Sequence, residues 1–413
     1  MNPRLANQPW LLAESTQRIM QILEARGRPA RFVGGCVRDS LLCDGLDSVD
    51  IDIATAERPE AVMNQLRAEA VKVIPTGLKH GTVTAVLDDR FFEITTLRLD
   101  VETDGRHAEV AFTDDFDLDA ARRDFTINAL RADRHGEVAD PFGGIDDLAR
   151  GTIRFVGDPE HRVVEDYLRI LRYFRFFARF GRLPADSASL TACRHQAAGL
   201  ERIAGERIQA EMTKLLAAAN AAVAAELMIE SGIQRHVLLP AVDLTPFFRL
   251  STIEPHPDWQ ICLAVWLRAG ASDLSDLLAL SERWRLANAD RKRLECLCLE
   301  TLPDPAAPAT DHRRYLYRLG REDYGDLLLI AQAMEPSSAE ALEAAQAIVK
   351  GWQKPVFPMD GDDLKKRGVV EGPALGECLQ ALEGWWRQRD FKPDRAALLT
   401  ELDRRLANER PIV

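Results

Sequence analysis

The sequence predicts an α+β fold in which a mixed head is followed by an all-helical remainder, and three observations support this division. Short runs rich in β-branched and aromatic residues alternate with short helical patterns up to about Gly157. Beyond this residue the strand-like runs fade, and segments rich in Ala, Leu and Arg are separated by breaks that contain Pro and Gly. At 413 residues the chain is also too long for one ordinary hydrophobic core.

The head contains candidate strands that each combine β-branched or aromatic residues with flanking turn residues. They are residues 31–33, 49–54, 82–87, 91–97 and 153–156. Residues 58–70 have a proline at their start and apolar residues at helical spacing, which predicts a helix. Residues 99–111 are polar around a central glycine, and this pattern predicts a mobile loop.

The composition is that of an ordinary soluble globular protein, with 46% apolar and 29% charged residues. No run of about eighteen apolar residues occurs, so we expect no membrane span. The first 27 residues predict a short amphipathic helix and lack the pattern of a signal peptide. The seven cysteines are scattered without a CxxC pair, which predicts reduced thiols in a cytoplasmic protein.

The net charge of −12 argues against a surface that is basic throughout and binds nucleic acid nonspecifically. Basic residues are nevertheless concentrated in residues 161–182, which contain two acidic residues and six arginines. These arginines are Arg162, Arg169, Arg172, Arg175, Arg179 and Arg182. A local basic groove is therefore compatible with the acidic total.

A glycine pair at Gly34 and Gly35 separates the first candidate strand from a predicted helix over residues 36–42. A helix that starts after such a turn presents backbone N–H groups to an anion, and Arg38 adds a positive charge one turn later. Taken alone, a glycine pair in this position is more often only a turn.

Two acids lie on the next candidate strand, where side chains alternate, so that Asp50 and Asp52 share one face. Carboxylates this close repel unless a cation lies between them, although a solvated strand face is the alternative for an isolated pair. Beside a phosphate-binding turn the metal interpretation is favoured, and oxygen ligands favour Mg²⁺. Glu93, on a strand that could lie alongside, could complete a two-metal site or merely bond to neighbouring Thr or Arg side chains.

Residues 118–130 predict a helix that carries Arg122 and Arg123. Both guanidinium groups are candidates for contacts with a triphosphate, since their geometry suits phosphate oxygens. The alternative is a salt-bridge cluster on the helix surface with Asp119 and Asp124.

A second arginine-rich helix is predicted to begin near Asp166, with a buried apolar stripe that starts at Tyr167. Asp166 and Arg169 are three residues apart and can act together on a base edge. A carboxylate acceptor beside a guanidinium donor matches the amino group and ring nitrogen of cytosine or adenine, but not the oxygen of uracil or guanine. Arg172 and Arg175 would contact phosphate or base, and the alternative for Asp166 and Arg169 is a surface ion pair.

These motifs, in the order found here, resemble those of bacterial class II CCA-adding enzymes, the tRNA nucleotidyltransferases of the polymerase-β superfamily. The resemblance is dense over residues 28–215 and rests on GGCVRD, DSVDIDIAT, TGLKHGTVTAVL, FEITTLR, RRDFTINAL, DPFGGIDDLARGTIRFVGDP, EDYLRILRYFRF and GERIQAE. It implies a polymerase-β-like nucleotidyltransferase head followed by an all-α neck, body and tail. The implied segments are an N-terminal helical segment at 1–27, the head at 28–157, the neck with a nucleotide-reading helix at 158–215, the body at 216–300 and the tail at 301–413.

The resemblance also implies site roles, a Mg²⁺ cofactor, CTP and ATP as substrates and tRNA as the acceptor. Asp50 and Asp52 would bind the metal, and the nucleotide-binding residues would be Gly35, Arg38, Arg122, Arg123, Asp166, Arg169, Arg172 and Arg175. Relatives in the same superfamily include poly(A) polymerases, and an inactive RNA-binding relative is a further alternative. Residues 76–87 resemble the CCA-adding version, and residues 104–112 resemble the flexible loop that such enzymes use to switch from C to A.

Overall fold

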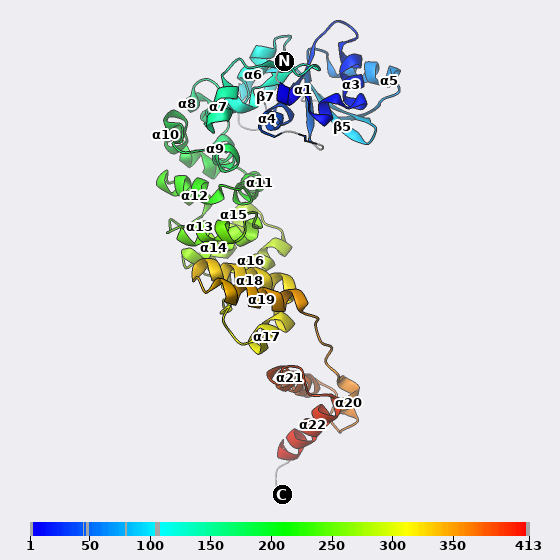
Figure 1. Ribbon diagram of the computed structural model, residues 1–413, viewed down its shortest axis with the longest axis vertical. Helices are drawn as coiled ribbons and strands as arrows, with labels where there is room; N and C mark the ends of the chain where they lie inside the picture. Colours follow the sequence, from blue (N-terminus) through cyan, green and yellow to red (C-terminus); the bar gives the residue numbers. More distant parts are fainter. Residues whose placement is uncertain (1–2, 44, 47–48, 79–80, 104–107, 410–413) are drawn as a thin grey trace. The chain divides into compact units, whose positions relative to one another are not determined.

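The computed structural model describes residues 3–43, 45–46, 49–78, 81–103 and 108–409 (Figure 1). By its internal contacts the chain forms two compact units, Met1–Ala241 with Ala279–Leu286, and Val242–Leu278 with Ala287–Val413. The division into five segments stays a prediction. Every helix in the described residues is too short or too polar to cross a membrane.

The first unit begins with helices that pack on a mixed sheet. Its helices up to residue 150 are α1 (Pro3–Ala6), α2 (Pro9–Leu12), α3 (Glu14–Glu24), α4 (Gly35–Leu42), α5 (Pro59–Ala68), α6 (Phe116–Ala121), the 3-10 turn η2 (Thr126–Asn128) and α7 (Gly144–Arg150). Its strands are β1 (Ala30–Val33), β2 (Ile51–Thr55), β3 (Lys72–Gly77), β4 (Thr82–Leu87), β5 (Arg90–Thr96), β6 (Arg98–Thr103), β7 (Ala108–Phe112), β8 (Arg131–Ala132) and β9 (Val138–Ala139). Most of the predicted strands and the helix α5 are thus confirmed.

Seven strands form one sheet in the order β3-β4-β5-β2-β1-β8-β9. Only β2 and β5 run parallel among its neighbouring pairs, with Asp52 opposite Glu93 in the register. Ile51 and Ile53 are buried on β2 while Asp52 is partly exposed, as the predicted alternation requires. The parallel pairing therefore brings two carboxylate-bearing positions, far apart in sequence, to adjacent places on the sheet.

A strand and a loop predicted for the head are wrong. The predicted strand at 153–156 forms only an isolated bridge between Phe155 and Phe125, because these residues pair with the short extended segment around Phe125 and not with the sheet. The segment predicted as a loop at 99–111 is largely the antiparallel ribbon of β6 and β7, while its residues 104–107 lie outside the described part. Such a ladder is made by backbone hydrogen bonds, which a polar side-chain pattern does not reveal.

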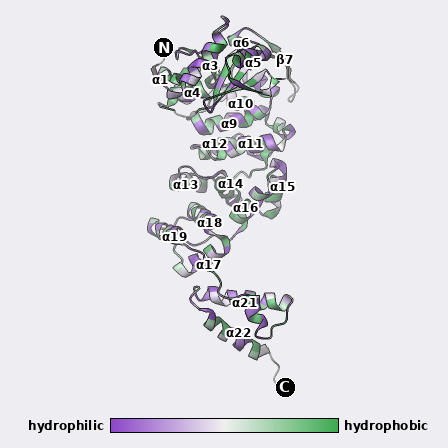
Figure 2. Cartoon of the chain, turned by 90° about the vertical axis from the view of Figure 1, so that its right-hand side faces the viewer, coloured by the Kyte–Doolittle hydropathy of each residue, from purple (hydrophilic) through white to green (hydrophobic). Residues whose placement is uncertain are grey.

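Beyond residue 157 the regular elements of the described chain are all helical (Figure 1). In the first unit they are α8 (Pro159–Glu165), α9 (Leu168–Phe180), α10 (Ser187–His195), η3 (Ala197–Arg202), α11 (Gly205–Leu216), α12 (Ala221–Glu230) and η4 (Gln234–Val237). The later helices are α13 (Thr245–Ile253), α14 (Trp259–Ala269), α15 (Leu274–Trp284), α16 (Asn288–Leu299), α17 (Ala309–Leu319), α18 (Arg321–Met334), α19 (Ala339–Gly351), α20 (Gly361–Lys365), α21 (Pro373–Gln388) and α22 (Arg395–Glu409). Figure 2 shows hydrophobic and hydrophilic residues interleaved along these helices, as expected of elements that each bury one face.

Helix α9 joins the helical region to the head through aromatic side chains. Phe125 lies with its ring centroid 4.9 Å from that of Phe155 and 5.2 Å from that of Phe176. Tyr173 and Phe174 are fully buried beside this group. Because these rings are large and close-packed, they fix α9 against the segment that carries Arg122 and Arg123.

Gly144→Ala should destabilise the first unit, because a Cβ at this position would lie 2.2 Å from the carbonyl oxygen of Thr126. Backbone atoms cannot move aside as a flexible side chain can, so we expect a loss of about 1–3 kcal/mol in the free energy of unfolding. Gly77→Ala is the matched control, since its nearest new contact would be an ordinary 3.5 Å to the Cβ of Thr82. Urea unfolding followed by fluorescence measures both, and equal stability of the two variants would contradict this account.

Candidate active site

The glycine turn between β1 and α4 adopts a conformation that requires glycine. Gly34 has φ 72° and ψ −129°, and a Cβ there would lie 3.3 Å from Nη1 of Arg123 and 3.7 Å from Oδ2 of Asp52. The turn therefore passes close to both a carboxylate and a guanidinium group. Gly35 begins α4 directly after it.

Arg38 on α4 is buried and held from several sides. Its Nη1 donates to Oδ1 of Asn128 at 2.5 Å and its Nε to Oδ1 of Asp39 at 2.8 Å. The guanidinium carbon also lies 4.4 Å from the ring centroid of Phe180, within range of a cation–π interaction. The predicted anion-binding arginine is thus fixed in place before any ligand arrives.

The carboxylates Asp52 and Glu93 face each other across the parallel strands β2 and β5, and Asp50 lies exposed just before β2. Burial, followed by the negative charges of Glu93 and Asp50, raises the pKa of Asp52 to about 6, although Arg123 opposes this shift. Within the described residues no three His, Cys, Asp or Glu side chains form a complete metal-binding group. One or two carboxylates are nevertheless the usual protein share of a Mg²⁺ site that substrate phosphates complete, so these acids fit such an ion.

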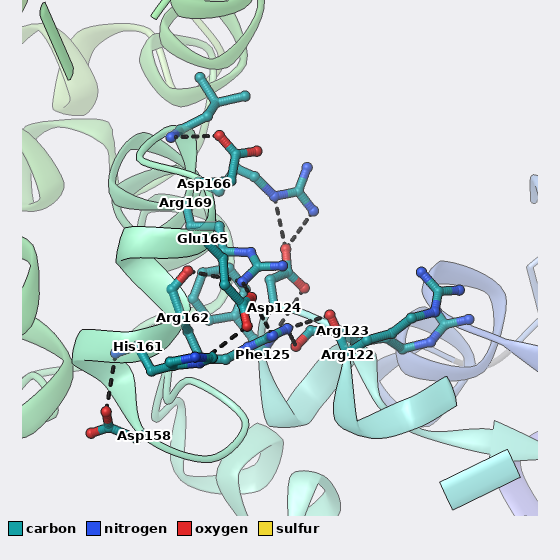
Figure 3. Close-up of polar contacts among 12 residues, drawn as sticks. Arg122, Arg123, Asp124, Phe125, Asp158, His161, Arg162, Glu165, Asp166 and Arg169 are labelled. Carbon is teal, nitrogen blue, oxygen red and sulfur yellow. Dashed lines mark hydrogen bonds and ion pairs between the residues drawn. The ribbon is translucent and has the colours of Figure 1, made fainter. Parts of the chain in front are cut away.

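The segment that carries Arg122 and Arg123 is not the continuous helix predicted over residues 118–130. Helix α6 ends at Ala121, and the chain becomes extended at Phe125, with φ −123° and ψ 151°, before η2. Nη2 of Arg162 donates to the carbonyl oxygens of both arginines, where a continued helix would place backbone N–H groups. Figure 3 shows the side chains of Arg122 and Arg123 directed away from Arg162.

Arg122 and Arg123 both contact Asp119, and this part of the salt-bridge alternative is confirmed. Arg122 donates to Oδ1 of Asp119 at 2.9 and 2.7 Å, and Nη2 of Arg123 lies 3.5 Å from Oδ2. Asp119 is buried, so the cluster is not on the surface. The other acid of that alternative, Asp124, pairs with Arg172 instead, with Nε 2.8 Å from Oδ2.

Asp166 and Arg169 do not form an ion pair with each other, so the alternative to base reading is not what the structure shows. Asp166 lies between α8 and α9, where it accepts from the N–H of Leu168 at 3.1 Å and from Nη2 of Arg207 at 2.7 Å. Arg169 donates to Glu165 and, at 2.8 Å, to the carbonyl oxygen of Arg162. The two groups differ in partner because the chain is not helical at Asp166.

Arg172 and Arg175 are held by buried acids. Burial alone would raise the pKa of Asp124, but the charge of Arg172, together with hydrogen bonds from Asn128, Arg172 and the N–H of Phe125, lowers that pKa below its usual value. Glu211 on α11 lies 3.7 Å from Nη1 of Arg172 and 2.6 Å from Nε of Arg175. Both arginines therefore have structural partners in addition to any ligand.

A cavity of about 450 Å³ gathers most of the predicted nucleotide-binding residues. Its lining is Gly34, Gly35, Arg38, Arg122, Arg123, Asp124, Asn128, Asp166, Leu168, Arg169, Arg172, Phe176 and Arg207. Six arginines against two acids suit an anion of high charge, such as a nucleoside triphosphate. Arg175 does not line this cavity.

A second cavity of about 620 Å³ shares Gly35 and Arg38 with the first and includes both Asp50 and Asp52. Arg179 and Phe180 also line it. The two acids thus lie beside, and not inside, the arginine-rich cavity, with the glycine turn common to both spaces.

Sequence reasoning missed several residues of the site, among them Asn128, Arg207 and Glu211. Asn128 follows Asp124 by four residues, and its Nδ2 donates to Oδ1 of that acid at 2.9 Å. The motif containing Arg207 and Glu211 was part of the resemblance, but only the folded chain brings α11 against α9.

Known proteins match this chain over nearly its whole length. Residues 30–154 match the "Poly A polymerase head domain" family, and residues 186–244 match "Probable RNA and SrmB- binding site of polymerase A". The chain is 34% identical to a mitochondrial CCA tRNA nucleotidyltransferase 1 of Danio rerio, over 93% of this chain and 89% of that protein. It is 32% identical to a CCA-adding enzyme of Limosilactobacillus fermentum, over 89% of this chain and 91% of that protein.

Solved structures agree with these relatives. A Bacillus stearothermophilus CCA-adding enzyme in complex with CTP superposes with a TM-score of 0.78 at 27% identity, covering 99% of each chain. A Thermotoga maritima CCA-adding enzyme complexed with tRNA has the same fold, with a TM-score of 0.67 at 21% identity and 94% of each chain covered. The resemblance inferred from the motifs is confirmed: this chain belongs to the CCA-adding enzymes, a family of tRNA nucleotidyltransferases that carry a poly(A) polymerase head domain.

Proposed function

We propose that this enzyme adds C, C and A in turn to the 3′ end of tRNA, taking the nucleotides from CTP and ATP. The observation that carries the proposal is the arginine-rich cavity, which combines Arg122 and Arg123 with Asp166 and Arg169 and adjoins Asp52 through the glycine turn. A nucleotide bound there would have its phosphates near Arg122 and Arg123 and its base near Asp166 and Arg169. A cytoplasmic setting is consistent with the seven cysteines, which are all free thiols.

Base selection would depend on Asp166 and Arg169. Each carboxylate oxygen of Asp166 already accepts one hydrogen bond, but a carboxylate has about four acceptor positions in total. It can therefore still accept from the amino group of cytosine or adenine while Arg169 donates to the ring nitrogen. Arg207, whose Nη2 donates to Oδ2 of Asp166 at 2.7 Å, keeps the carboxylate oriented for this contact.

Asp50 and Asp52 would hold Mg²⁺, and Glu93 beside Asp52 would complete the acids for a second ion. When bound, the metal neutralises triphosphate charge and lowers the pKa of the attacking 3′-hydroxyl. Arg38, Arg122 and Arg123 supply further positive charge to the phosphates, and Gly35 allows their close approach at the start of α4. Arg172 lines the cavity, whereas Arg175 would act through Glu211, which also lies near Arg172.

The test is incubation of full-length enzyme and Mg²⁺ with tRNA that lacks CCA, with CTP and ATP supplied separately and together. We expect CTP alone to add two residues, both nucleotides together to add three, and EDTA to stop the reaction until Mg²⁺ is restored. Products on a sequencing gel decide between the alternatives. Long A tails would identify a poly(A) polymerase, and absence of any incorporation would indicate an inactive RNA-binding relative.

A further inference from the structure

Arg162 on α8 is a buried arginine that does not line the nucleotide cavity. It is 7% exposed, and its Nη2 donates to the carbonyl oxygen of Arg123 at 2.6 Å and to that of Arg122. The backbone carbonyl groups of Arg122 and Arg123 face Arg162 (Figure 3), and the same two residues line the cavity. The guanidinium group of Arg162 therefore holds the backbone of both Arg122 and Arg123 through their carbonyl groups.

The same side chain also reaches the base-reading end of the cavity. Its Nη1 donates to Oε2 of Glu165, and the same carboxylate oxygen accepts from Nη1 of Arg169. Arg169 further donates to the carbonyl oxygen of Arg162 at 2.8 Å. A continuous set of hydrogen bonds thus runs from the backbone of Arg122 and Arg123 through Arg162 and Glu165 to Arg169 (Figure 3).

Burying the charge of Arg162 costs free energy, and this cost is not explained if the residue only stabilises the fold. Burial, and then the like charge of Arg169, lower the pKa of Arg162, while Glu165 opposes the shift. Nε of Arg162 is buried without a hydrogen-bond partner in the described structure. Replacing a whole buried ion pair by well-packed apolar residues often leaves stability unchanged or improves it, so stability alone does not explain such a group.

Glu165 is held ionised between the two arginines. Burial alone would raise the pKa of Glu165, but the hydrogen bond from Arg169 and the charges of Arg162 and Arg169 lower it. A charged carboxylate hydrogen-bonded on both sides is a stiff connection, because charge-assisted bonds are short and strong. Arg162 and Glu165 therefore set the distance from Arg122 and Arg123 to Arg169.

We propose that Arg162 is a positioning residue for nucleotide selection, which fixes Arg122 and Arg123 relative to Arg169 without touching the nucleotide. The inference rests on the proposed function of the cavity and deepens it. A base is selected only when its edge meets Arg169 while its phosphates meet the other arginines. If the distance between Arg169 and the phosphate-binding arginines could vary, a non-matching base could also reach a reactive position. For the matching base, a displacement of about 1 Å can lower the rate by roughly 10²-fold.

The experiment compares Arg162→Met and Arg162→Lys with wild type in single-nucleotide addition to tRNA lacking CCA, using CTP and UTP. We expect Arg162→Met to lower kcat/KM for CTP by about 10²-fold and the CTP-to-UTP preference by roughly tenfold. Lysine keeps the charge but lacks the planar fork that reaches the carbonyl groups and Glu165 together. Arg162→Lys should therefore fold normally and show an intermediate loss of preference.

Arg283→Met is the matched control, because Arg283 also donates to two backbone carbonyls, those of Ile203 at 3.0 Å and Leu200 at 2.8 Å. These contacts lie in the same unit but away from the cavity. We expect this variant to lose thermal stability while its CTP-to-UTP preference stays at the wild-type value.

The proposal is overturned if Arg162→Lys, or a folded Arg162→Met, keeps the wild-type preference and KM for CTP and loses only stability, as the control does. Failure of Arg162→Met to fold leaves the lysine variant to decide. Failure of the wild-type enzyme to add CCA would instead refute the proposed function, so the two outcomes are distinguishable.

Discussion

Asp52→Asn is expected to lower the rate of nucleotide addition by about 10³-fold or more while leaving tRNA affinity unchanged. The substitution keeps the shape of the side chain but removes one of the charged oxygens that would bind the metal, and metal stabilisation of the transition state amounts to several kcal/mol. Affinity for tRNA should survive because phosphate contacts elsewhere dominate binding to nucleic acid. Single-turnover addition of CTP and a filter-binding titration with tRNA measure the two quantities.

Asp89→Asn is the control for this variant. Asp89 lies in the turn that joins β4 to β5, so the change removes one carboxylate from the same sheet outside both cavities. Asparagine also tolerates its positive φ of 58°. The unfolding temperature of metal-free Asp52→Asn should not fall, because the change removes a charge crowded against Glu93. If Asp52→Asn transferred nucleotide at nearly the wild-type rate, Asp52 would not hold the metal.

Asp166→Asn is expected to relax the discrimination against UTP by about ten- to a hundredfold, which corresponds to roughly 1–3 kcal/mol for a mispaired polar group. Asparagine can still accept from the N–H of Leu168, so the local structure should persist. Its amide can in addition donate to the O4 atom of uracil, which the carboxylate cannot do. The measurement is kcat/KM for CTP, ATP and UTP on tRNA that lacks CCA.

Glu160→Gln is the matched change for Asp166→Asn, since Glu160 lies on α8 near Asp166 but pairs with His195 at 2.8 Å outside the cavity. It should leave nucleotide preference at the wild-type value. If Asp166→Asn instead weakened CTP, ATP and UTP by the same factor, its role would be general binding and not base selection.

The parts of the site that sequence reasoning reached are those governed by local periodicity. Alternation along one strand places Asp50 and Asp52 on the same face, and a glycine pair before a helix marks the turn at Gly34. Glu93 could be named only as a candidate, because its place beside Asp52 depends on which strands become neighbours. That choice is made by the packing of the whole sheet.

The residues that were missed depend on chain breaks and on distant partners. A helical pattern continues past Ala121, and nothing local indicates that Arg162, about forty residues later, takes the carbonyl bonds of Arg122 and Arg123. Arg207 likewise reaches Asp166 across 41 residues. The spacing of Asp166 and Arg169 leaves a surface ion pair open as the alternative to base reading, because periodicity does not reveal the break in the helix between α8 and α9.

The parallel pairing of β2 with β5 also bears on how this head can vary in evolution. A parallel pair needs a long connection, and here the chain passes through α5, β3 and β4 between the two strands. Insertions or deletions in the loops of that connection change its length without changing which residues of β2 and β5 lie opposite each other. A slip of β5 by a single residue, in contrast, would turn Glu93 to the opposite face, so this strand tolerates substitution far better than a change of length.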